Sequence, residues 1–468
     1  MPLHPDRFLG SHAGQVALAR PLYDSVAALP LVCPHGHVDP ALLARNERFP
    51  EPTSLLVTPD HYILRMLYSL GVPMERLGVS RVDGTPSTAD PREVWRTLAA
   101  HWFAFAGTPT RAWMEYQMEE VFGIREKLGP ANADEIYDSI DARLAEPSFR
   151  PRALFDRFGI EVLTTTDGAA DGLEYHEAIA ASGWKGRVVP CFRPDAVFKI
   201  ASPRWRAEMD RLSAVCGRAV DSYNAFIEAL ADRRLRFKAL GATSTDHGVE
   251  IPLTRRLPIA EAIRLFDRAL AGRAEPADQM AFEAHMLMEM ARMSLDDGLV
   301  MQLHAGSFRD HNPWLAEVFG TDKGADIPVA VDWTRNLRDL LAAYGNDPRF
   351  RLVLFTLDES TYARELAPLA GHYPAVRLGP PWWFHDSIEG MLRYRRQVTE
   401  TAGFWNTAGF NDDTRAFPSI PARHDLARRI DARYAAELLA DRRIDEEEAY
   451  GIVRALAYDL ARDTYRLG

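Results

Sequence analysis

Several features are scarce or missing in this 468-residue chain, and each absence excludes something. It has three cysteines, Cys33, Cys191 and Cys216, too few for a disulfide framework, so a reducing compartment is favoured. No apolar run approaches the roughly 20 residues that a membrane helix needs, and residues 1–10 lack the apolar core of a signal peptide. We therefore expect a cytoplasmic protein with no membrane partner.

An excess of positive charge is also missing. The chain carries 55 Lys and Arg against 66 Asp and Glu, a net charge of −11, which provides no general basic field for nucleic acid. What is present is typical of a soluble globular protein with a large core, because 47% of the residues are hydrophobic and 26% are charged. The composition leaves the oligomeric state open.

Short apolar runs that resemble buried strands recur along the chain and alternate with segments of helical apolar spacing. This alternation is typical of a parallel sheet, and eight such units favour a closed β/α barrel over an open sheet. The sequence therefore predicts an α/β protein with one barrel spanning residues 1–468. The expected strands are Leu29–Cys33, Ile160–Thr165, Arg187–Phe192, Arg236–Ala242, Leu299–His304, Arg351–Leu357, Ala375–Gly379 and Gly403–Phe410.

The connection between the first two expected strands is far longer than the dozen or so residues that a simple crossover needs. We expect residues 40–155 to form a helical insertion that covers the mouth of the barrel. Because barrel active sites use the loops that follow the strands, this insertion can contribute residues to the site. The expected helices are Tyr62–Leu70, Val94–Phe105, Ala112–Phe122 and Ala133–Leu144.

The strongest chemical signal is His35-Gly36-His37, at the end of the first expected strand. Two imidazoles at positions i and i+2 leave a strand on the same side and can chelate a divalent ion such as zinc. In a closed barrel the first and eighth strands are neighbours, so Asp413 can reach the same ion, although Asp412 is an alternative ligand. His304, after the fifth strand, is either a further ligand or a hydrogen-bond donor to substrate.

Other polar and aromatic residues fall at the same end of the expected barrel, where active sites of this fold lie. Arg193 and Arg415 follow the third and eighth strands. His61 and Tyr62 open a helix of the insertion, with Arg65 one turn later. Either residue of this pair alone reads as a surface residue at a helix start. Trp382 and Trp383 suit stacking on a sugar or simple core packing.

These motifs, in this order, resemble the uronate isomerases, a branch of the metal-dependent amidohydrolase superfamily. The resemblance covers nearly the whole chain. It rests on Pro34-His35-Gly36-His37, Pro59-Asp60-His61-Tyr62 with Arg65, Phe192-Arg193-Pro194-Asp195, Asp246-His247-Gly248, Gln302-Leu303-His304, Gly379 through Asp386, and Asp413-Thr414-Arg415.

The resemblance implies a distorted (β/α)8 barrel that interconverts D-glucuronate with D-fructuronate and D-galacturonate with D-tagaturonate through a cis-enediol, in hexuronate catabolism. It implies one divalent cofactor, usually zinc. The implied ligands are His35, His37 and Asp413; the implied catalytic residues are Asp413, Tyr62, His61 and Arg415; and the implied substrate-binding residues are Arg65, His304, Trp382, Trp383 and Arg193.

One residue departs from the family pattern, and two other functions stay open. His385 stands where the family often has Asn, which could alter contacts to sugar hydroxyls. Hydrolysis is the first alternative, since similar barrels activate water for attack on amides or esters, but the sequence places no Lys directly at a strand end as a ligand for a second metal. A carbohydrate-binding protein without activity is the other, and it would not need His61, Tyr62 and Arg415.

Overall fold

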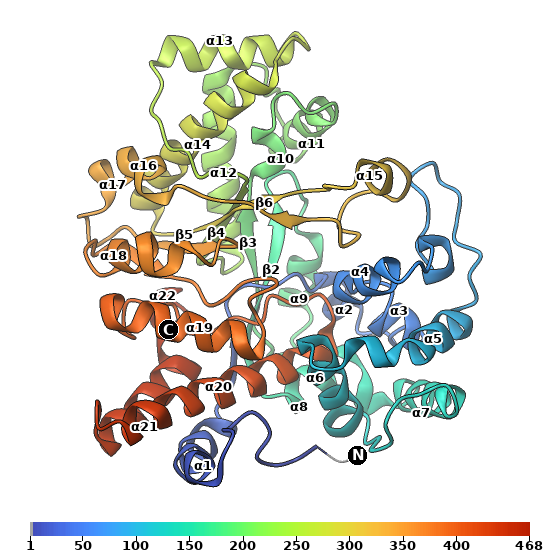
Figure 1. The fold of residues 1–468 in the computed structure, drawn as a ribbon. Coiled ribbons are helices and arrows are strands. Elements are labelled where there is room, and N and C mark those ends of the chain that lie inside the picture. Colours follow the sequence, from blue (N-terminus) through green and yellow to red (C-terminus); the bar gives the residue numbers. More distant parts are fainter. Residues whose placement is uncertain (1–2) are drawn as a thin grey trace.

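The computed structural model describes residues 3–468 and centres on a curled parallel sheet (Figure 1). Seven strands pair in the order β1-β2-β3-β4-β5-β8-β9, and a separate antiparallel pair joins β6 to β7. Their bounds are β1 Leu31–Cys33, β2 Ile160–Gly168, β3 Val188–Arg193, β4 Ser244–Val249, β5 Val300–Ala305, β6 Ser307–Phe308, β7 Ile327–Pro328, β8 Leu352–Thr356 and β9 Val376–Leu378.

The expected strand at Gly403–Phe410 is wrong as a strand. This segment makes one isolated parallel bridge, between Thr407 and Leu378 of β9. On the far side, the N–H of His37 donates to the carbonyl of Thr414 at 2.9 Å. Gly403 and Gly409 adopt φ of 69° and 73°, which interrupts an extended strand. The structure therefore contains a seven-stranded curled sheet, with an irregular segment between β9 and β1.

The fourth strand was also misplaced. The expected run Arg236–Ala242 lies in the last turn of helix α12 (Tyr223–Ala239) and in the turn after it, and the strand is Ser244–Val249. Its sequence, Ser-Thr-Asp-His-Gly-Val, has no apolar run. Its polar side chains are nevertheless buried, because they contact other polar groups. Periodicity of hydrophobic residues therefore could not detect it.

Between β1 and β2 the chain forms helices, as predicted, and a further helix, which was not predicted, precedes β1. These are α1 (Ala13–Ala27), α2 (Pro40–Arg45), α3 (Pro52–Leu56), α4 (His61–Ser69), α5 (Pro91–Ala100), α6 (Pro109–Tyr116), α7 (Ala133–Leu144) and α8 (Pro151–Arg157). In Figure 1, α2 to α7 group on one side of the sheet. Their apolar faces share a core with β1 and β2, which includes Trp95, Ile140 and Leu163.

The remaining helices follow later strands and pack around the sheet (Figure 1). They are α9 (Glu174–Ala181), α10 (Asp195–Phe198), α11 (Trp205–Cys216), α12, α13 (Ile259–Leu270), α14 (Pro276–Asp297), α15 (Pro313–Phe319), α16 (Trp333–Asn336), α17 (Arg338–Tyr344), α18 (Ala367–Ala370), α19 (Ile388–Ala402), α20 (Ile420–Ala440), α21 (Glu446–Arg454) and α22 (Leu460–Thr464).

The inner face of the curled sheet is lined by valines. Five strands each contribute one valine to a cluster that also contains Tyr465 and Leu467 from the C-terminal end. Alternate residues such as Leu163 point instead to the outer core, as the two-residue period of a strand requires. The inner face of the sheet is therefore filled by apolar side chains, which leaves the carboxyl ends of the strands as the place for a polar site. The five valines are Val32, Val162, Val189, Val300 and Val353.

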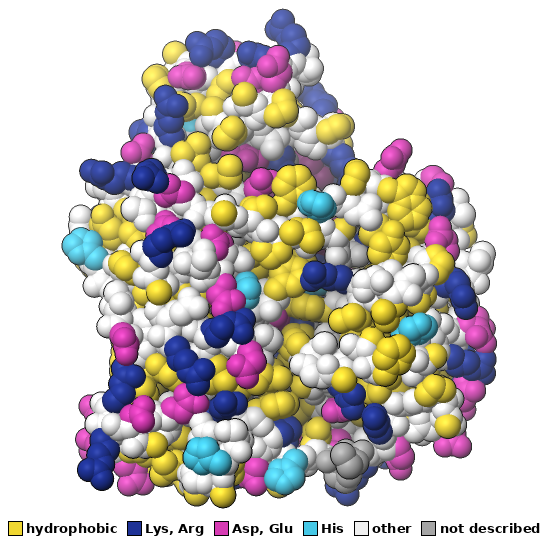
Figure 2. All heavy atoms as spheres, in the orientation of Figure 1, with side chains coloured by type: hydrophobic (Ala, Val, Ile, Leu, Met, Phe, Trp, Pro, Cys, Tyr) yellow, Lys and Arg dark blue, Asp and Glu magenta, His cyan; other side chains and the backbone are white. Residues whose placement is uncertain are grey.

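Two surface properties bear on partners. In residues 3–468, no helix has the length and apolar character needed to cross a bilayer. On the face drawn in Figure 2, basic and acidic side chains are interspersed, which agrees with the weak case for a polyanion partner.

Candidate active site

A cavity of about 310 Å³ opens at the carboxyl ends of the strands and is lined by polar and aromatic side chains. It lies at the lower end of the size range of small-molecule sites. The loops after β1 and β3, the start of α4 and the connection between β6 and β7 all contribute to it. Of the predicted site residues, the lining includes His37, His61, Tyr62, Arg193, Trp382, Trp383, Asp413 and Arg415.

The predicted metal ligands meet at the floor of this cavity. Nε2 of His35 lies 3.4 Å from Oδ1 of Asp413, and Nε2 of His37 lies 3.2 Å from the same oxygen. Within the described residues, Asp413 Oδ1 has no hydrogen-bond partner, so these contacts lack hydrogen-bond geometry. Two imidazole nitrogens and a carboxylate oxygen around one point fit a divalent ion.

Local backbone geometry supports this arrangement. Asp413 has φ of 44°, in the left-handed region that a residue other than glycine rarely adopts. Burial alone would raise the pKa of the Asp413 carboxyl, but the contacts with His35 and His37 outweigh burial and hold that pKa well below its usual range. The carboxylate therefore stays ionised, as a metal ligand must.

A second ionisable group supports His35 from behind. His304 stacks on His35, with ring centroids 4.7 Å apart, and its Nδ1 lies 2.7 Å from Oδ1 of Asp246. Arg193 contacts the other oxygen of Asp246 at 3.2 Å. Burial would raise the pKa of Asp246, but Arg193 and His304 lower it well below its usual value. Asp246 therefore stays charged and fixes both His304 and Arg193.

The insertion contributes His61 and Tyr62 at the first turn of α4. The Asp60 carboxylate caps this helix by accepting hydrogen bonds from the N–H groups of Tyr62 and Ile63, which fixes where the turn begins. The His61 ring stacks on Tyr62 and meets Trp383 edge-on. Burial, with a contribution from nearby Arg415, lowers the pKa of His61 to about 3. His61 is therefore neutral at ordinary pH.

Tyr62 is held by a carboxylate. Its hydroxyl donates to Asp386, at 2.9 and 3.0 Å from the two oxygens. Arg423 of α20 donates to Asp386 Oδ2 at 2.9 Å, and its guanidinium lies over the ring of Trp113. Burial and the Asp386 charge raise the pKa of Tyr62 well above its usual value. The phenol therefore stays protonated and donates its hydrogen bond to Asp386.

Besides the buried ligand His35, two predicted site residues lie apart from the cavity lining. Arg65 is exposed and lies over the ring of Phe384, with 4.4 Å to the centroid. His304 is buried behind His35, among Phe355 and Trp382, rather than on the cavity wall. Arg65 can therefore act on the site through Phe384, and His304 through His35.

His385 also lies away from the cavity. Its Nε2 lies 3.1 Å from the carbonyl of Leu357, and its Nδ1 lies 3.2 Å from Glu359. The expectation that it alters contacts to sugar hydroxyls is not supported by this position, because both ring nitrogens face other partners.

Sequence reasoning missed much of the cavity wall. Asp386 and Arg423 form the Tyr62 network described above. The connection between β6 and β7 supplies a charged rim in which Arg309 pairs with Asp326 at 2.8 Å and Arg415 pairs with Asp322 at 3.0 Å. Asp386, Arg423 and the acidic and basic residues of the β6–β7 connection do not directly follow a strand of the main sheet. A search limited to strand ends therefore could not find them. The remaining missed charged residues are Lys199 and Asp310.

Comparisons with known proteins agree with one another. A sequence profile described as glucuronate isomerase matches residues 6–465. A uronate isomerase of Brucella canis is 54% identical over 467 residues and covers 100% of both chains. One from Nostoc punctiforme is 54% identical over 466 residues, covering 99% of this chain and 98% of its own.

Solved structures give the same result. The crystal structure of glucuronate isomerase from Caulobacter crescentus superposes with a TM-score of 0.97 at 50% identity, covering 99% of this chain and 97% of that one. The uronate isomerase from Thermotoga maritima superposes with a TM-score of 0.92 at 25% identity, covering 99% and 100%.

Proposed function

The chain belongs to the glucuronate isomerase family, and on this premise we propose that it interconverts D-glucuronate with D-fructuronate and D-galacturonate with D-tagaturonate. One observation carries the proposal: a metal-ligand group and a tyrosine–carboxylate pair line the same small cavity. Aldose–ketose isomerisation needs both functions, because an oxygen must be polarised while a proton moves between neighbouring carbons.

His35, His37 and Asp413 would hold the cofactor, which we propose to be zinc. The ligand set of two imidazoles and one carboxylate leaves a coordination position for substrate, as catalytic zinc sites require. When bound, the ion polarises substrate oxygens and lowers the pKa of a coordinated hydroxyl. Asp413, which lines the cavity, would accept the proton of the anomeric hydroxyl as the sugar ring opens.

Tyr62 and Asp386 would move the carbon-bound proton. A phenol can accept a proton from carbon 2 only if its own proton leaves, and the hydrogen bond to Asp386 provides that route. Burial raises the pKa of the Asp386 carboxyl, so it is suited to hold the proton briefly. As carbon 2 loses its proton, oxygen 1 gains one and the cis-enediol forms. Return of the proton to carbon 1, with loss of the oxygen 2 proton, yields the ketose.

The surrounding residues would orient the sugar and stabilise charge. The neutral His61 ring has a buried Nε2 without a hydrogen-bond partner in the described chain, so it is available to a substrate hydroxyl. Arg415 supplies positive charge near the oxygen that develops negative charge, which typically contributes about 3 kcal/mol. Trp382 and Trp383 present aromatic faces to the sugar, and Arg193 is placed to bind its carboxylate.

The fold explains why these groups meet. Residues 40–155, which we propose cover the mouth of the cavity, contribute His61 and Tyr62 to its lining. We propose that the irregular segment around Asp413 occupies the eighth position of a (β/α)8 barrel. Two contacts support this: Thr407 bridges to Leu378 of β9, and the Thr414 carbonyl accepts a hydrogen bond from the N–H of His37, which follows β1. This position brings Asp413 beside His35 and His37, as barrel closure requires.

The proposal is tested with purified, zinc-loaded protein and each uronate in D₂O. We expect ketose formation, observed by proton NMR, together with deuterium at carbon 1 of the product or carbon 2 of recovered substrate. His35→Asn should greatly reduce both signals. Absence of ketose and of exchange with both sugars would overturn the isomerase proposal and favour hydrolysis by the same cavity.

A further inference from the structure

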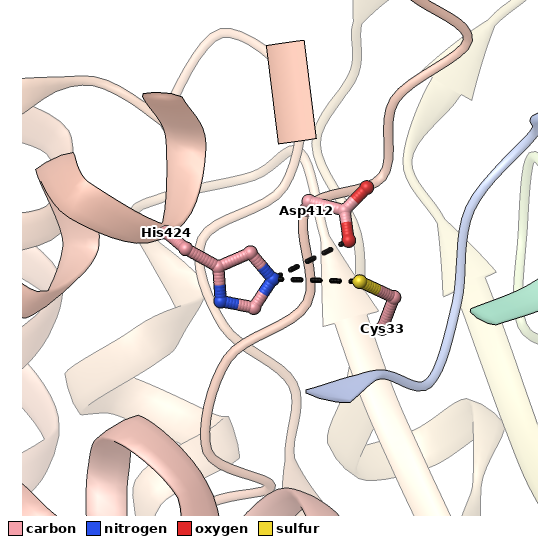
Figure 3. A group of neighbouring side chains, drawn as sticks. All are labelled: Cys33, Asp412 and His424. Atoms are coloured by element: carbon pink, nitrogen blue, oxygen red, sulfur yellow. Dashed lines mark hydrogen bonds and ion pairs between the residues drawn. The ribbon is translucent and has the colours of Figure 1, made fainter. Parts of the chain in front are cut away.

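A second group of metal-ligating side chains lies behind the catalytic ligands. It consists of Cys33 at the end of β1, Asp412 in the segment before Asp413, and His424 in α20 (Figure 3). All three are buried, with exposed fractions of 0% for Cys33 and 2% for the other two. None of them lines the catalytic cavity. This group, called the sealed triad below, has no role in the proposed reaction.

The sealed triad has the geometry of a ligand set. Nε2 of His424 lies 3.6 Å from Sγ of Cys33 and 3.5 Å from Oδ2 of Asp412, and Figure 3 shows both contacts converging on one ring nitrogen. In a tetrahedral zinc site, sulfur and nitrogen ligands at about 2.3 and 2.1 Å from the ion are separated by roughly 3.6 Å. The observed separations match that arrangement.

The ligands of the catalytic cavity and the sealed triad share one feature, a buried carboxylate oxygen that has no hydrogen-bond partner within residues 3–468. In the catalytic cavity, His–Asp contacts of 3.2 to 3.4 Å leave Asp413 Oδ1 without a hydrogen-bond partner. In the sealed triad, Asp412 Oδ2 likewise has no hydrogen-bond partner among residues 3–468, although His424 Nε2 lies close to it. A carboxylate oxygen that faces a nitrogen outside hydrogen-bond geometry is the expected result of shared coordination to an ion.

The charge of Asp412 has little compensation from protein. Its other oxygen, Oδ1, accepts one long hydrogen bond of 3.4 Å from the N–H of Thr414. Arg423 donates to the backbone carbonyl of Asp412, and Arg428 donates to backbone carbonyls of residues 27, 29 and 30. A buried carboxylate with so few hydrogen-bond donors is costly, and a bound cation would offset that cost.

We propose that Cys33, Asp412 and His424 bind a second divalent cation, of the zinc class, distinct from the ion of the catalytic cavity. A thiolate, an imidazole and a carboxylate together favour zinc over magnesium or calcium. Binding displaces the thiol proton of Cys33 to solvent, so no oxidant or reductant is required. The bound ion ties β1, α20 and the segment that carries Asp413 together.

A second cavity adjoins the sealed triad at His424. This cavity has a volume of about 370 Å³ and is bounded by residues that include Leu31, Phe158 and Arg428. The three protein donors leave one tetrahedral position that a water molecule from this side can fill.

Cobalt substitution tests the proposal without relying on activity. The protein is stripped with a chelator and titrated with Co²⁺, and the near-ultraviolet absorption of thiolate-to-cobalt charge transfer is recorded. No cysteine lines the catalytic cavity, so this band reports only the sealed triad. We expect two cobalt ions per chain and the band in wild type. Cys33→Ser should bind one ion without the band, and His35→Asn should bind one ion with it.

Cys191→Ser is the matched control, because Cys191 is equally buried but contacts Ser244 and Gln302 instead. It should keep both ions and the band. One ion per chain in wild type, with no charge-transfer band, would overturn the proposal and leave a hydrogen-bonded cluster. This wild-type titration decides the matter even if Cys33→Ser fails to fold.

Discussion

Two candidate ligand groups draw on the same two short segments yet differ in solvent access. The cavity group uses His35, His37 and Asp413, and the sealed triad uses Cys33 and Asp412 from the same stretches of chain. His37 and Asp413 have side-chain exposures of 26% and 18%, whereas Asp412 and His424 have 0% and 2%. Neighbouring residues thus serve opposite sides of one backbone segment.

The contrast separates two uses of similar chemistry. An ion that faces a cavity can exchange a ligand for substrate, whereas an ion enclosed by protein can only hold segments together. The left-handed conformation of Asp413 joins the two groups, because it turns consecutive carboxylates in different directions. The variants below test whether the two groups differ in role and in solvent access.

The largest expected effect is that of Asp413→Asn. It removes both a cavity ligand and the proposed proton acceptor for ring opening, so we expect kcat/KM for D-glucuronate to fall by about 10³-fold or more. The matched variant Asp412→Asn acts only through its neighbour and should cost about 10- to 100-fold. Steady-state kinetics of both variants is the measurement. Equal losses would mean that the two carboxylates do not have separate roles.

The second-largest expected effect is that of Tyr62→Phe, which changes only the catalytic cavity. It keeps the ring packed against His61 but removes the proton route to Asp386. We expect kcat to fall by about 10²-fold or more, with KM within about threefold and deuterium exchange at carbon 2 lost in proportion. Tyr137→Phe, on another helix of the insertion, is the control because its hydroxyl contacts Glu51. Unchanged exchange in Tyr62→Phe would remove Tyr62 from proton transfer.

A smaller effect should appear in stability. In the His35→Asn background the cavity group is disabled, so chelation acts on the sealed triad. Removing zinc that was present at 100 times its Kd should lower the free energy of unfolding by about 2.7 kcal/mol. Urea unfolding with and without chelator measures this difference. In the double variant with Cys33→Ser, chelation should change little, and an equal change there would place the stabilising ion elsewhere.

Sequence reasoning found the residues whose position follows from local rules. His35 and His37 follow β1, and Asp413 follows the irregular segment that bridges to β9, so the structure brings the three side chains together at one edge of the sheet. The start of α4 was predicted at Tyr62, within one residue of the observed start at His61. Asp60, which caps the helix, fixes this start.

What escaped prediction depends on tertiary contact. Arg423 reaches Asp386 from the first turn of α20, and nothing in its local sequence indicates this contact. Strand β4 was missed because Thr245 and Asp246 are buried polar residues: Thr245 contacts His247 within the strand, and Asp246 contacts His304 of β5. The sequence assigned Cys33 no chemical role and offered Asp412 only as an alternative to Asp413, because nothing local indicates that the fold places His424 close to both.

The smallest effect concerns how far water reaches into the cavity. The pKa of His61 is lowered to about 3, so the folded protein does not take up a proton at this ring until far below pH 6.5, whereas the unfolded chain does. The unfolded state therefore binds more protons as pH falls below 6.5, and folding stability falls with it. His61→Gln removes this contribution, so its free energy of unfolding should fall less steeply between pH 6.5 and 4.

Urea unfolding at several pH values measures the slope, with His101→Gln at the end of α5 as the control. NMR titration of the His61 ring provides the independent check. A ring that titrates near pH 6.5 would mean that water enters the cavity freely in the absence of substrate. The catalytic group would then differ even more from the sealed triad in solvent access, and closure of the cavity around the sugar would have to depend on substrate binding.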